Sequence, residues 1–280
     1  MLDLSQNHTM LAPVNSFVRA QHLFLSRPTS VPGVLFGLLL SACASTHQIS
    51  EQSGLAVHTF THDSINTHLL VANGAMVMVD PGYEKNAPVL EKELRDAGLD
   101  PAMVKTIVVT HGHADHAGAA RHFQARFQAR VVAGKQDEGM LSTGKNERLC
   151  PTGFLGRWRH TEDEGATYTP FHADVDVTEP VDLASLSGVP GRIVPLPGHT
   201  RGSLVVLAGD AAFVGDLFRG SLVGSGAATH LYMCDLEGNK KDIARLLNEL
   251  APDAKRFFVG HFGPVAREDV ADYFEVLPRK

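Results

Sequence analysis

The amino-acid sequence predicts one folded domain of the α/β or α+β class over most of its length. Short runs rich in β-branched residues alternate with amphipathic, helix-like segments, and no long-period repeat or low-complexity linker interrupts them. With 44% hydrophobic and 20% charged residues in 280, the composition excludes a disordered chain and a polytopic membrane protein. The formal net charge of −6 provides no electrostatic footprint for nucleic acid, so none is expected as a partner.

Residues 1–42 differ in character from the rest of the chain. They contain only three charged side chains, Asp3, Arg19 and Arg27, and residues 31–40 form an uncharged apolar run. Such a run is too short to span a bilayer, but it matches the apolar region of a secretory signal. The alternative, a buried core helix, is disfavoured by the proline and the two glycines within the run.

Leu40-Ser41-Ala42-Cys43 follows the apolar run and resembles the bacterial lipoprotein signal, which implies cleavage before a lipid-modified Cys43. We therefore expect a signal peptide with this lipobox over 1–42, a polar tether over 43–54 and the folded domain over 55–280. The expected location is the periplasmic side of the cell envelope, with the lipid anchored in the membrane. Because Ala44 follows the cysteine, resemblance to Gram-negative lipoproteins favours the outer membrane.

Turn and helix signals place the elements of the domain. The Asn73-Gly74 pair predicts a hairpin between strands at 68–71 and 76–79. Helices are predicted over 88–97, which Gly98 ends, and over 115–129, where Phe123 and Phe127 share the face expected to pack in the core. Further strands are predicted at 106–110, 131–133, 193–196, 204–207, 212–214 and 256–259, with a helix at 242–250.

Residues 142–176 show neither strand nor helix periodicity and contain the only tryptophan, Trp158. A long irregular segment within a domain is either a functional lid or a solvated insertion, and the sequence leaves both open. Cys150 and Cys234 are the cysteines of the predicted domain. They either pair in an oxidising periplasm or remain two unrelated thiols.

Several predicted strands lead into residues that bind metal ions. The strand at 106–110 runs into His111-Gly112-His113-Ala114-Asp115-His116, and three later strands lead to His199, Asp216 and His261. A glycine directly precedes each of these last three residues and permits close backbone approach. Because ligand sites of α/β folds lie at the carboxyl ends of strands, these side chains can converge. Imidazole and carboxylate together suit Zn²⁺ and similar divalent ions.

His-Gly-His-Ala-Asp-His after a strand resembles the signature of the metallo-β-lactamase superfamily. Four further motifs occur in the order that this superfamily requires: Asp80-Pro81-Gly82, Pro197-Gly198-His199-Thr200, Gly215-Asp216 and Gly260-His261. The resemblance covers about residues 55–265 and implies a four-layer αββα sandwich with a dinuclear site. By position, it implies one ion held by His111, His113 and His199, a second held by Asp115, His116 and His261, and Asp216 bridging both. Asp80 resembles a supporting aspartate and not a ligand.

The same resemblance implies a hydrolase with two Zn²⁺ ions, for which Fe or Mn are alternatives. A metal-bound water becomes hydroxide near neutral pH and attacks an electrophilic carbonyl or phosphorus. Asp115 is the expected catalytic residue, which orients this nucleophile and carries its proton. Because position 216 is an aspartate and not a cysteine or serine, the resemblance favours small-molecule esters, thioesters or lactones over β-lactams.

Other functions stay open at this point. A mononuclear iron oxidoreductase of the same fold, similar to thiol or persulfide dioxygenases, has similar ligand motifs, and a true β-lactamase is a further alternative. A non-catalytic binding protein is disfavoured because no ligand of the set is missing.

Histidines outside the motifs give weaker signals. His230 and Tyr232 follow Asp216 in a glycine-rich stretch and are either substrate hydrogen-bond donors or ordinary loop residues. His160 and His172 in the irregular segment are weaker candidates still. We expect surface or packing roles for the remaining histidines that the analysis considered, namely His58, His62 and His122.

Overall fold

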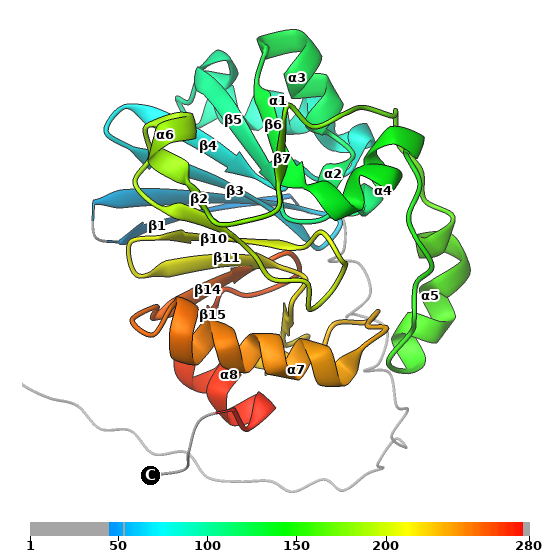
Figure 1. Cartoon of the computed structure of the whole chain (residues 1–280). Helices are drawn as coiled ribbons and strands as arrows, with labels where there is room; N and C mark the ends of the chain where they lie inside the picture. The colour runs from blue at the N-terminus through cyan, green and yellow to red at the C-terminus, as the bar shows by residue number, and fades with distance from the viewer. Residues whose placement is uncertain (1–44, 53, 277–280) are drawn as a thin grey trace, which may run out of the picture. The chain divides into compact units, whose positions relative to one another are not determined.

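Two mixed β-sheets pack face to face in the computed structural model, which describes residues 45–52 and 54–276 (Figure 1). Helices cover the outer face of each sheet, so that these residues form the four-layer αββα sandwich that the motifs implied. The eight α-helices of this region are α1 (Ala87–Asp96), α2 (Ala114–Ala117), α3 (Ala120–Phe127), α4 (Glu138–Thr143), α5 (Phe154–Glu164), α6 (Leu183–Ser187), α7 (Leu236–Arg245) and α8 (Arg267–Phe274).

The first sheet has seven strands in sequence order, antiparallel from β1 to β4 and parallel from β4 to β7. These strands are β1 (Thr46–Gln52), β2 (Leu55–His62), β3 (Ile65–Ala72), β4 (Ala75–Val79), β5 (Val104–Val109), β6 (Arg130–Gly134) and β7 (Val175–Val177). The predicted hairpin is confirmed between β3 and β4. Asn73 and Gly74 both have positive φ there, as a tight two-residue hairpin turn requires.

The second sheet has six strands in the order β15-β14-β11-β10-β9-β8, and a separate two-stranded ribbon joins β12 to β13. Its strands are β8 (Val181–Asp182), β9 (Arg192–Pro195), β10 (Leu204–Ala208), β11 (Ala211–Gly215), β14 (Arg256–Val259) and β15 (Val265–Ala266), and the ribbon is β12 (Arg219–Gly220) with β13 (Ala227–Ala228). Strands β11 and β14 are parallel, and β9 runs in the same direction because β10 is antiparallel to both β9 and β11.

Three apolar layers hold the sandwich together. Ile107 on one face of β5 packs with Leu94 and Phe123 of the outer helices, while Val108 on the other face packs against Phe258 of the second sheet. Successive side chains of a strand point to opposite faces, so a strand buried on both faces is apolar throughout. Each fully buried side chain of this size contributes about 1.5–3 kcal/mol to folding.

Residues 46–52, which the sequence analysis assigned to a tether, form edge strand β1 instead. The strand pairs with β2 from Thr46 opposite Thr61 to Gln52 opposite Leu55. It was missed because its side chains are polar and its one large apolar residue, Ile49, is 61% exposed. An edge strand of this kind is held by backbone hydrogen bonds and gives no alternating apolar pattern. The proposed signal peptide over 1–42 and Cys43 lie outside the described residues.

Two predicted helices differ in their boundaries. The helix expected over 115–129 is split into α2 and α3 at Gly118, where a Cβ atom would lie 2.5 Å from the Ala114 carbonyl oxygen. The helix expected over 242–250 begins earlier, as α7, because the Asp235 carboxylate accepts the Gly238 N–H and caps it. It continues as a π-helical turn over Leu246–Leu250.

The segment over 142–176 contains helix α5, which its sequence did not reveal. The outer face of α5 exposes Phe154 and Trp158, so no apolar stripe of the usual kind marks the helix. Among the described residues, no helix is both long and apolar enough to cross a membrane.

His68 on β3 provides a pH-dependent contribution to stability. Its ring makes T-shaped contacts with the stacked rings of Phe213 and Phe258, and its Nε2 lies 3.2 Å from the Val259 carbonyl oxygen. Burial lowers the pKa of His68 to about 4 from the ordinary 6.5. The folded protein therefore disfavours the proton, and stability that is present above pH 6.5 is lost as the pH falls towards 4.

We predict that His68→Gln flattens this pH dependence. Between pH 7 and pH 5, the unfolding free energy of the metal-free wild type should fall by about 2 kcal/mol more than that of the variant. Urea unfolding at the two pH values measures the difference. Identical pH dependence in both proteins would contradict this role for His68.

Candidate metal centre

Four strand ends meet at one edge of the sandwich and carry the metal-binding side chains. Strand β5 leads into the loop with His111 and His113 and then into α2 with Asp115, and β9 leads into the loop with His199. Strands β11 and β14, which are parallel neighbours, lead directly to Asp216 and His261. The structure thus brings all seven predicted metal-binding residues together, including His116 of α2.

Two glycines make this convergence possible. Gly215 has a φ of +53°, and a Cβ atom there would lie 2.3 Å from the Thr110 hydroxyl oxygen. At Gly260, a Cβ atom would lie 2.3 Å from the His116 ring and 2.4 Å from an Asp216 oxygen. Since real contacts are never this short, only glycine lets the two strand ends approach the site so closely.

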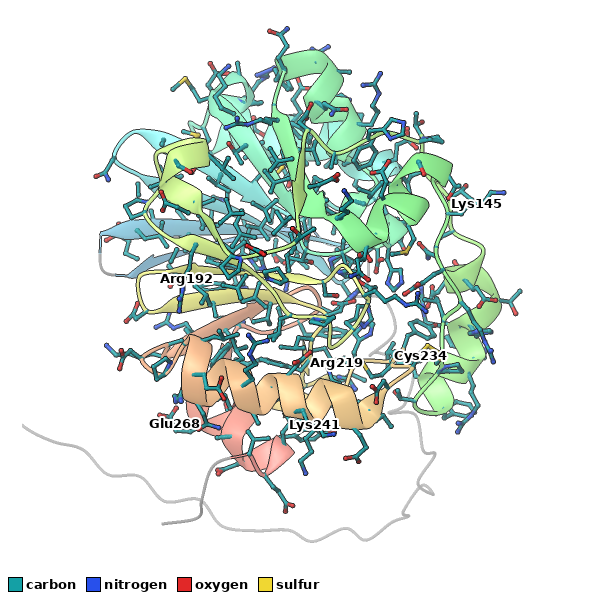
Figure 2. The ribbon with its side chains drawn as sticks, viewed as in Figure 1. Lys145, Arg192, Arg219, Cys234, Lys241 and Glu268 are labelled. Carbon is teal, nitrogen blue, oxygen red and sulfur yellow. A yellow bond between two sulfur atoms is a disulfide. The ribbon has the colours of Figure 1, made fainter. Side chains whose placement is uncertain are left out.

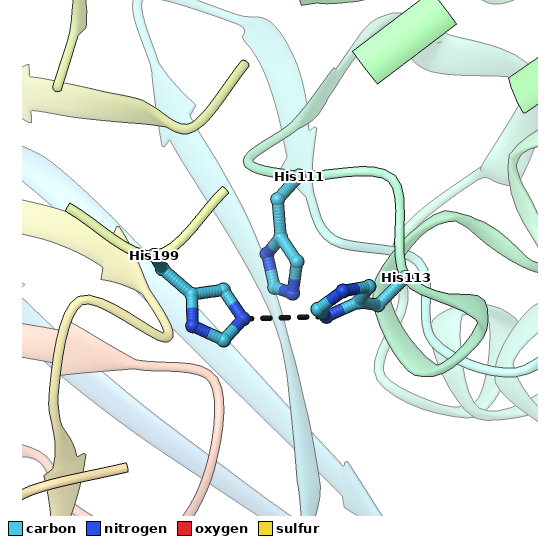
Figure 3. Close-up of side chains that lie close together, drawn as sticks. All are labelled: His111, His113 and His199. Carbon is cyan, nitrogen blue, oxygen red and sulfur yellow. Dashed lines mark hydrogen bonds between the residues drawn. The ribbon is translucent and has the colours of Figure 1, made fainter. Parts of the chain in front are cut away.

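The first cluster consists of three histidines, His111, His113 and His199 (Figure 3). His199 Nε2 lies 3.2 Å from His113 Nδ1, and the three ring centroids are 4.6–5.0 Å apart. Burial lowers the pKa of all three, to about 4 for His113. The rings are therefore neutral at pH 7, which leaves each a lone pair for a metal ion.

The second cluster combines two carboxylates with two histidines, Asp115, Asp216, His116 and His261. His261 Nε2 lies 3.3 Å from an oxygen of each carboxylate. Burial by itself would lower the pKa of His261, but Asp216 and Asp115 raise it to about 10. The pKa of His116 is raised as well, despite its burial, by Asp216, Asp115 and Asp80.

Asp216 lies between the two clusters. Its Oδ2 is 3.2 Å from His116 Nε2 and 3.3 Å from His261 Nε2, and it is 3.8–3.9 Å from the nearest nitrogens of His111 and His199. Burial would raise the pKa of this carboxyl, but the surrounding histidines hold it well below its usual range. The site thus has one ionised carboxylate that faces both clusters.

Several buried atoms of these residues have no hydrogen-bond partner within the described chain. They include the Nε2 atoms of His111, His116 and His261 and Asp216 Oδ1, whereas His113 and His199 face each other through Nδ1 and Nε2. An unsatisfied buried polar atom costs about 1–3 kcal/mol. So many at one site fit a centre whose nitrogen and oxygen donors bind divalent metal ions.

Asp80 orients one histidine of each cluster. It accepts the His116 Nδ1–H at 2.9 Å and the Thr110 hydroxyl at 2.6 Å, and the same hydroxyl oxygen lies 3.1 Å from His111 Nδ1. Fixing Nδ1–H in this way turns the Nε2 lone pair towards the site. The geometry agrees with the supporting role that the resemblance implied for Asp80.

Asp137 was missed by the sequence analysis, although it lies just beyond the carboxyl end of β6, at the same edge. Its buried carboxylate accepts the Gly112 N–H at 2.9 Å, the Thr200 hydroxyl at 2.7 Å and the Gly202 N–H at 2.8 Å. It thereby joins the two loops that carry the first cluster. The Tyr168 hydroxyl donates to the Gly112 carbonyl oxygen at 2.7 Å and secures the same loop.

Asn66 on β3 holds the loop that carries His261. Its side-chain amide donates to the carbonyl oxygens of Val259 at 2.9 Å and Phe262 at 2.6 Å. His261 Nδ1 also lies 3.1 Å from the Ser64 carbonyl oxygen, which fixes the ring. No sequence signal marked Asn66, because the contact joins residues nearly 200 positions apart.

Of the weaker histidine candidates, only His230 belongs to the centre. Its Nε2 lies 3.0 Å from Asp216 Oδ2. His160 instead contacts the Leu149 carbonyl oxygen, and His172 contacts Glu138 on the surface. His58, His62 and His122 make surface or packing contacts, as expected.

The irregular segment is tied to the site, and so it is not a free solvated insertion. A disulfide joins Cys150 to Cys234, which lies in the segment before α7, beside α5 (Figure 2). Tyr232 adds hydrogen bonds from its hydroxyl to the Gly156 carbonyl oxygen at 3.2 Å and to Asp163 at 2.5 Å. The sequence had left the cysteine pairing open.

Comparison with known proteins identifies the family. The metallo-beta-lactamase superfamily matches residues 60–261, and the chain belongs to this superfamily. Membership of this superfamily and the cluster of histidines and aspartates support an enzyme of the metallo-hydrolase class. This confirms the family, fold and enzyme class that the sequence motifs predicted.

Relatives and solved structures agree with this assignment. A beta-lactamase hydrolase-like protein of Agrobacterium fabrum is 27% identical over 78% of this chain and 50% of its own length. A hydroxyacylglutathione hydrolase of Xanthomonas campestris is 32% identical over 52% of this chain and 44% of its own. The chain thus spans about half the length of these relatives.

Among solved structures, a Cronobacter sakazakii metallo-beta-lactamase variant has a TM-score of 0.56 at 19% identity, covering 79% of this chain and 80% of its own. A subclass B3 metallo-beta-lactamase of Bradyrhizobium japonicum has a TM-score of 0.55 at 17% identity, with coverages of 79% and 87%. At these identities the likeness shows the fold.

We predict that Asp80→Asn weakens zinc binding by about 10- to 100-fold, the usual effect of losing an outer hydrogen-bond partner. Asparagine tolerates the positive φ at this position, but its amide group cannot accept from all three donors around Asp80. Chelator competition measures the affinity, and the exposed Asp272→Asn is the matched control. Wild-type affinity in folded Asp80→Asn would contradict the role.

Proposed function

We propose that the protein is a hydrolase that binds two metal ions and cleaves a small-molecule ester, thioester, lactone or related bond. The observation that carries this proposal is the Asp216 carboxylate, which faces both clusters. His111, His113 and His199 would hold one ion, and Asp115, His116 and His261 would hold the other. Zinc, or iron or manganese in its place, would lower the pKa of water and polarise a carbonyl group.

Asp115 is the residue that we propose to handle protons during the reaction. Its side chain is 21% exposed, whereas that of Asp216 is 1% exposed, so Asp115 is the carboxylate that water and substrate can reach. Burial would raise its pKa, but His116 and His261 lower it and keep it ionised at neutral pH. An ionised carboxylate at the edge of the site can orient a water molecule and accept a proton from it.

The aspartate at position 216 supports ester-like substrates over β-lactams. A carboxylate offers two hard oxygen donors and can contact two ions at once, whereas a thiolate offers one soft sulfur. The name of the Xanthomonas relative, a hydroxyacylglutathione hydrolase, also supports an acyl substrate. The similar solved structures are metallo-beta-lactamases, but their low identity does not extend the likeness to substrate.

We predict that the zinc-loaded protein hydrolyses esters, thioesters or lactones with higher kcat/KM than penicillins or carbapenems. Asp216→Ala should lose both metal and activity, since each cluster loses its shared donor, while the exposed Asp253→Ala retains both. Steady-state kinetics and metal analysis test these statements. Turnover of β-lactams together with no turnover of esters, thioesters or lactones would contradict the proposed substrate class. A protein that binds a single iron ion and has dioxygenase activity would be an oxidoreductase, and the proposed hydrolase function would be wrong.

We further propose that the protein is exported and anchored by lipid at Cys43 on the periplasmic side of the envelope. The lipobox-like motif at 40–43 supports this, and the disulfide suits an oxidising compartment. Stable anchoring needs more than one acyl chain. The proposed partners are thus the membrane, through the lipid, and a small-molecule substrate.

For the full chain expressed in a Gram-negative host, we predict a mature N-terminus at a lipid-modified Cys43, located in the outer-membrane fraction. Mass spectrometry of the N-terminal peptide tests this, with Cys43→Ser as the variant that cannot be modified. An uncleaved chain with an unmodified Cys43 would exclude the anchor.

A further inference from the structure

His230 is an additional histidine in the metal centre that the superfamily motifs do not include. It lies two residues beyond β13 and is only 5% exposed. Its Nε2 is 3.0 Å from Asp216 Oδ2, the shortest distance from any histidine of the site to this oxygen. Its ring centroid is 5.0 Å from that of His199 and 5.3 Å from that of His261, so the ring lies beside both clusters.

The contacts of His230 define where its proton lies. The Tyr232 N–H donates to His230 Nδ1 at 3.3 Å, and a backbone N–H can only donate. In the tautomer that accepts this hydrogen bond, Nδ1 holds the lone pair and the ring proton is on Nε2, directed at Asp216. The opposite tautomer would donate to the Tyr232 carbonyl oxygen at 3.2 Å, but it would turn a lone pair towards a carboxylate. Only the first tautomer satisfies both the Tyr232 N–H and Asp216.

The other histidines around Asp216 cannot supply this hydrogen bond once the centre binds metal. Within the described residues, five histidines have a nitrogen within 4 Å of Asp216 Oδ2, namely His111, His116, His199, His230 and His261. All of them except His230 belong to the proposed ligand set, and a ligand directs its lone pair at the ion. His230 thus remains as the side-chain N–H donor among them.

A cross-linked pair of segments, 149–152 and 230–234, holds His230 in this position. The Thr152 hydroxyl donates to the His230 carbonyl oxygen at 2.7 Å, and the Thr152 N–H donates to the Leu231 carbonyl oxygen at 2.9 Å. The Met233 N–H donates to the Cys150 carbonyl oxygen at 2.8 Å, and the Cys150–Cys234 disulfide closes the pair. We call these two segments the disulfide clamp.

We propose that His230 is a positioning residue, which donates its Nε2–H to Asp216 and fixes this carboxylate between the two clusters, and that the disulfide clamp holds His230 there. The inference rests on the proposed function, in which Asp216 binds both metal ions. Under this proposal, metal affinity also depends on His230, a residue that lies outside the motifs.

Three substitutions at position 230 test the hydrogen bond. The amide nitrogen of His230→Gln reaches about as far as Nε2, whereas that of His230→Asn reaches only as far as Nδ1, and His230→Ala has no donor. Zinc affinity, measured by chelator competition, should fall about 10- to 100-fold in the Ala and Asn variants and return close to wild type in the Gln variant. Equal affinity in all four proteins, or equal loss in all three variants, would overturn the proposal.

Cobalt substitution separates a positioning role from direct ligation. Each histidine ligand of Co²⁺ retains one exchangeable ring N–H with a strongly shifted proton resonance, so the five histidines of the two clusters should give five. We expect the same number in wild type and in His230→Gln. A further resonance in wild type that is lost in the variant would show that His230 is itself a ligand, and the proposal would be wrong.

A double-mutant cycle tests the clamp. Cys150→Ser with Cys234→Ser should weaken zinc binding in the wild-type background but add little in the His230→Ala background, because both changes act on the same contact. Additive losses would contradict the clamp's action through His230. A wild type that does not bind two metal ions would contradict the proposed function, whereas unchanged affinity in the variants would contradict this inference alone.

Discussion

The electrostatics of one buried carboxylate organise the whole site. Asp216 is almost fully removed from water, yet it stays ionised because histidine side chains surround it. Burying a charge is strongly unfavourable unless partners compensate it. Those partners come from both sheets and from the segment after β13, and these parts must meet closely enough for His116, His261 and His230 to reach one oxygen. The two close glycine contacts at 215 and 260 follow directly from this requirement.

A second set of polar residues makes that convergence stable. Asp80 fixes a histidine in each cluster, Asp137 joins the two loops of the first cluster, and Asn66 holds the loop of His261. Each of the three links segments that are distant in sequence. Orientation of the metal-binding atoms therefore depends on tertiary contacts as much as on the motifs, which explains why an outer residue such as Asp80 should affect affinity.

The sequence could predict the parts of the structure that have local signals. The hairpin at Asn73-Gly74, the strands that precede each metal-binding residue and the convergence of those strand ends all followed from short patterns. Strand β1 could not be predicted because backbone pairing with β2 stabilises it, and its exposed Ile49 gives no alternation. Asp137 and His230 could not be assigned either, since their roles depend on contacts with residues such as Thr200 and Asp216, which only the folded chain brings near.

Helix α5 lies outside the motifs but is joined to the loop that carries His230. The seven proposed ligands all lie in the motifs, whereas α5 lies in the segment over 142–176. Tyr232 connects α5 to the loop of His230, and the disulfide joins the same two regions. The opposite face of α5 presents Phe154 and Trp158 at 79% and 72% exposure. The disulfide and the Tyr232 hydrogen bonds therefore hold α5 beside the loop of His230, whose ring contacts Asp216.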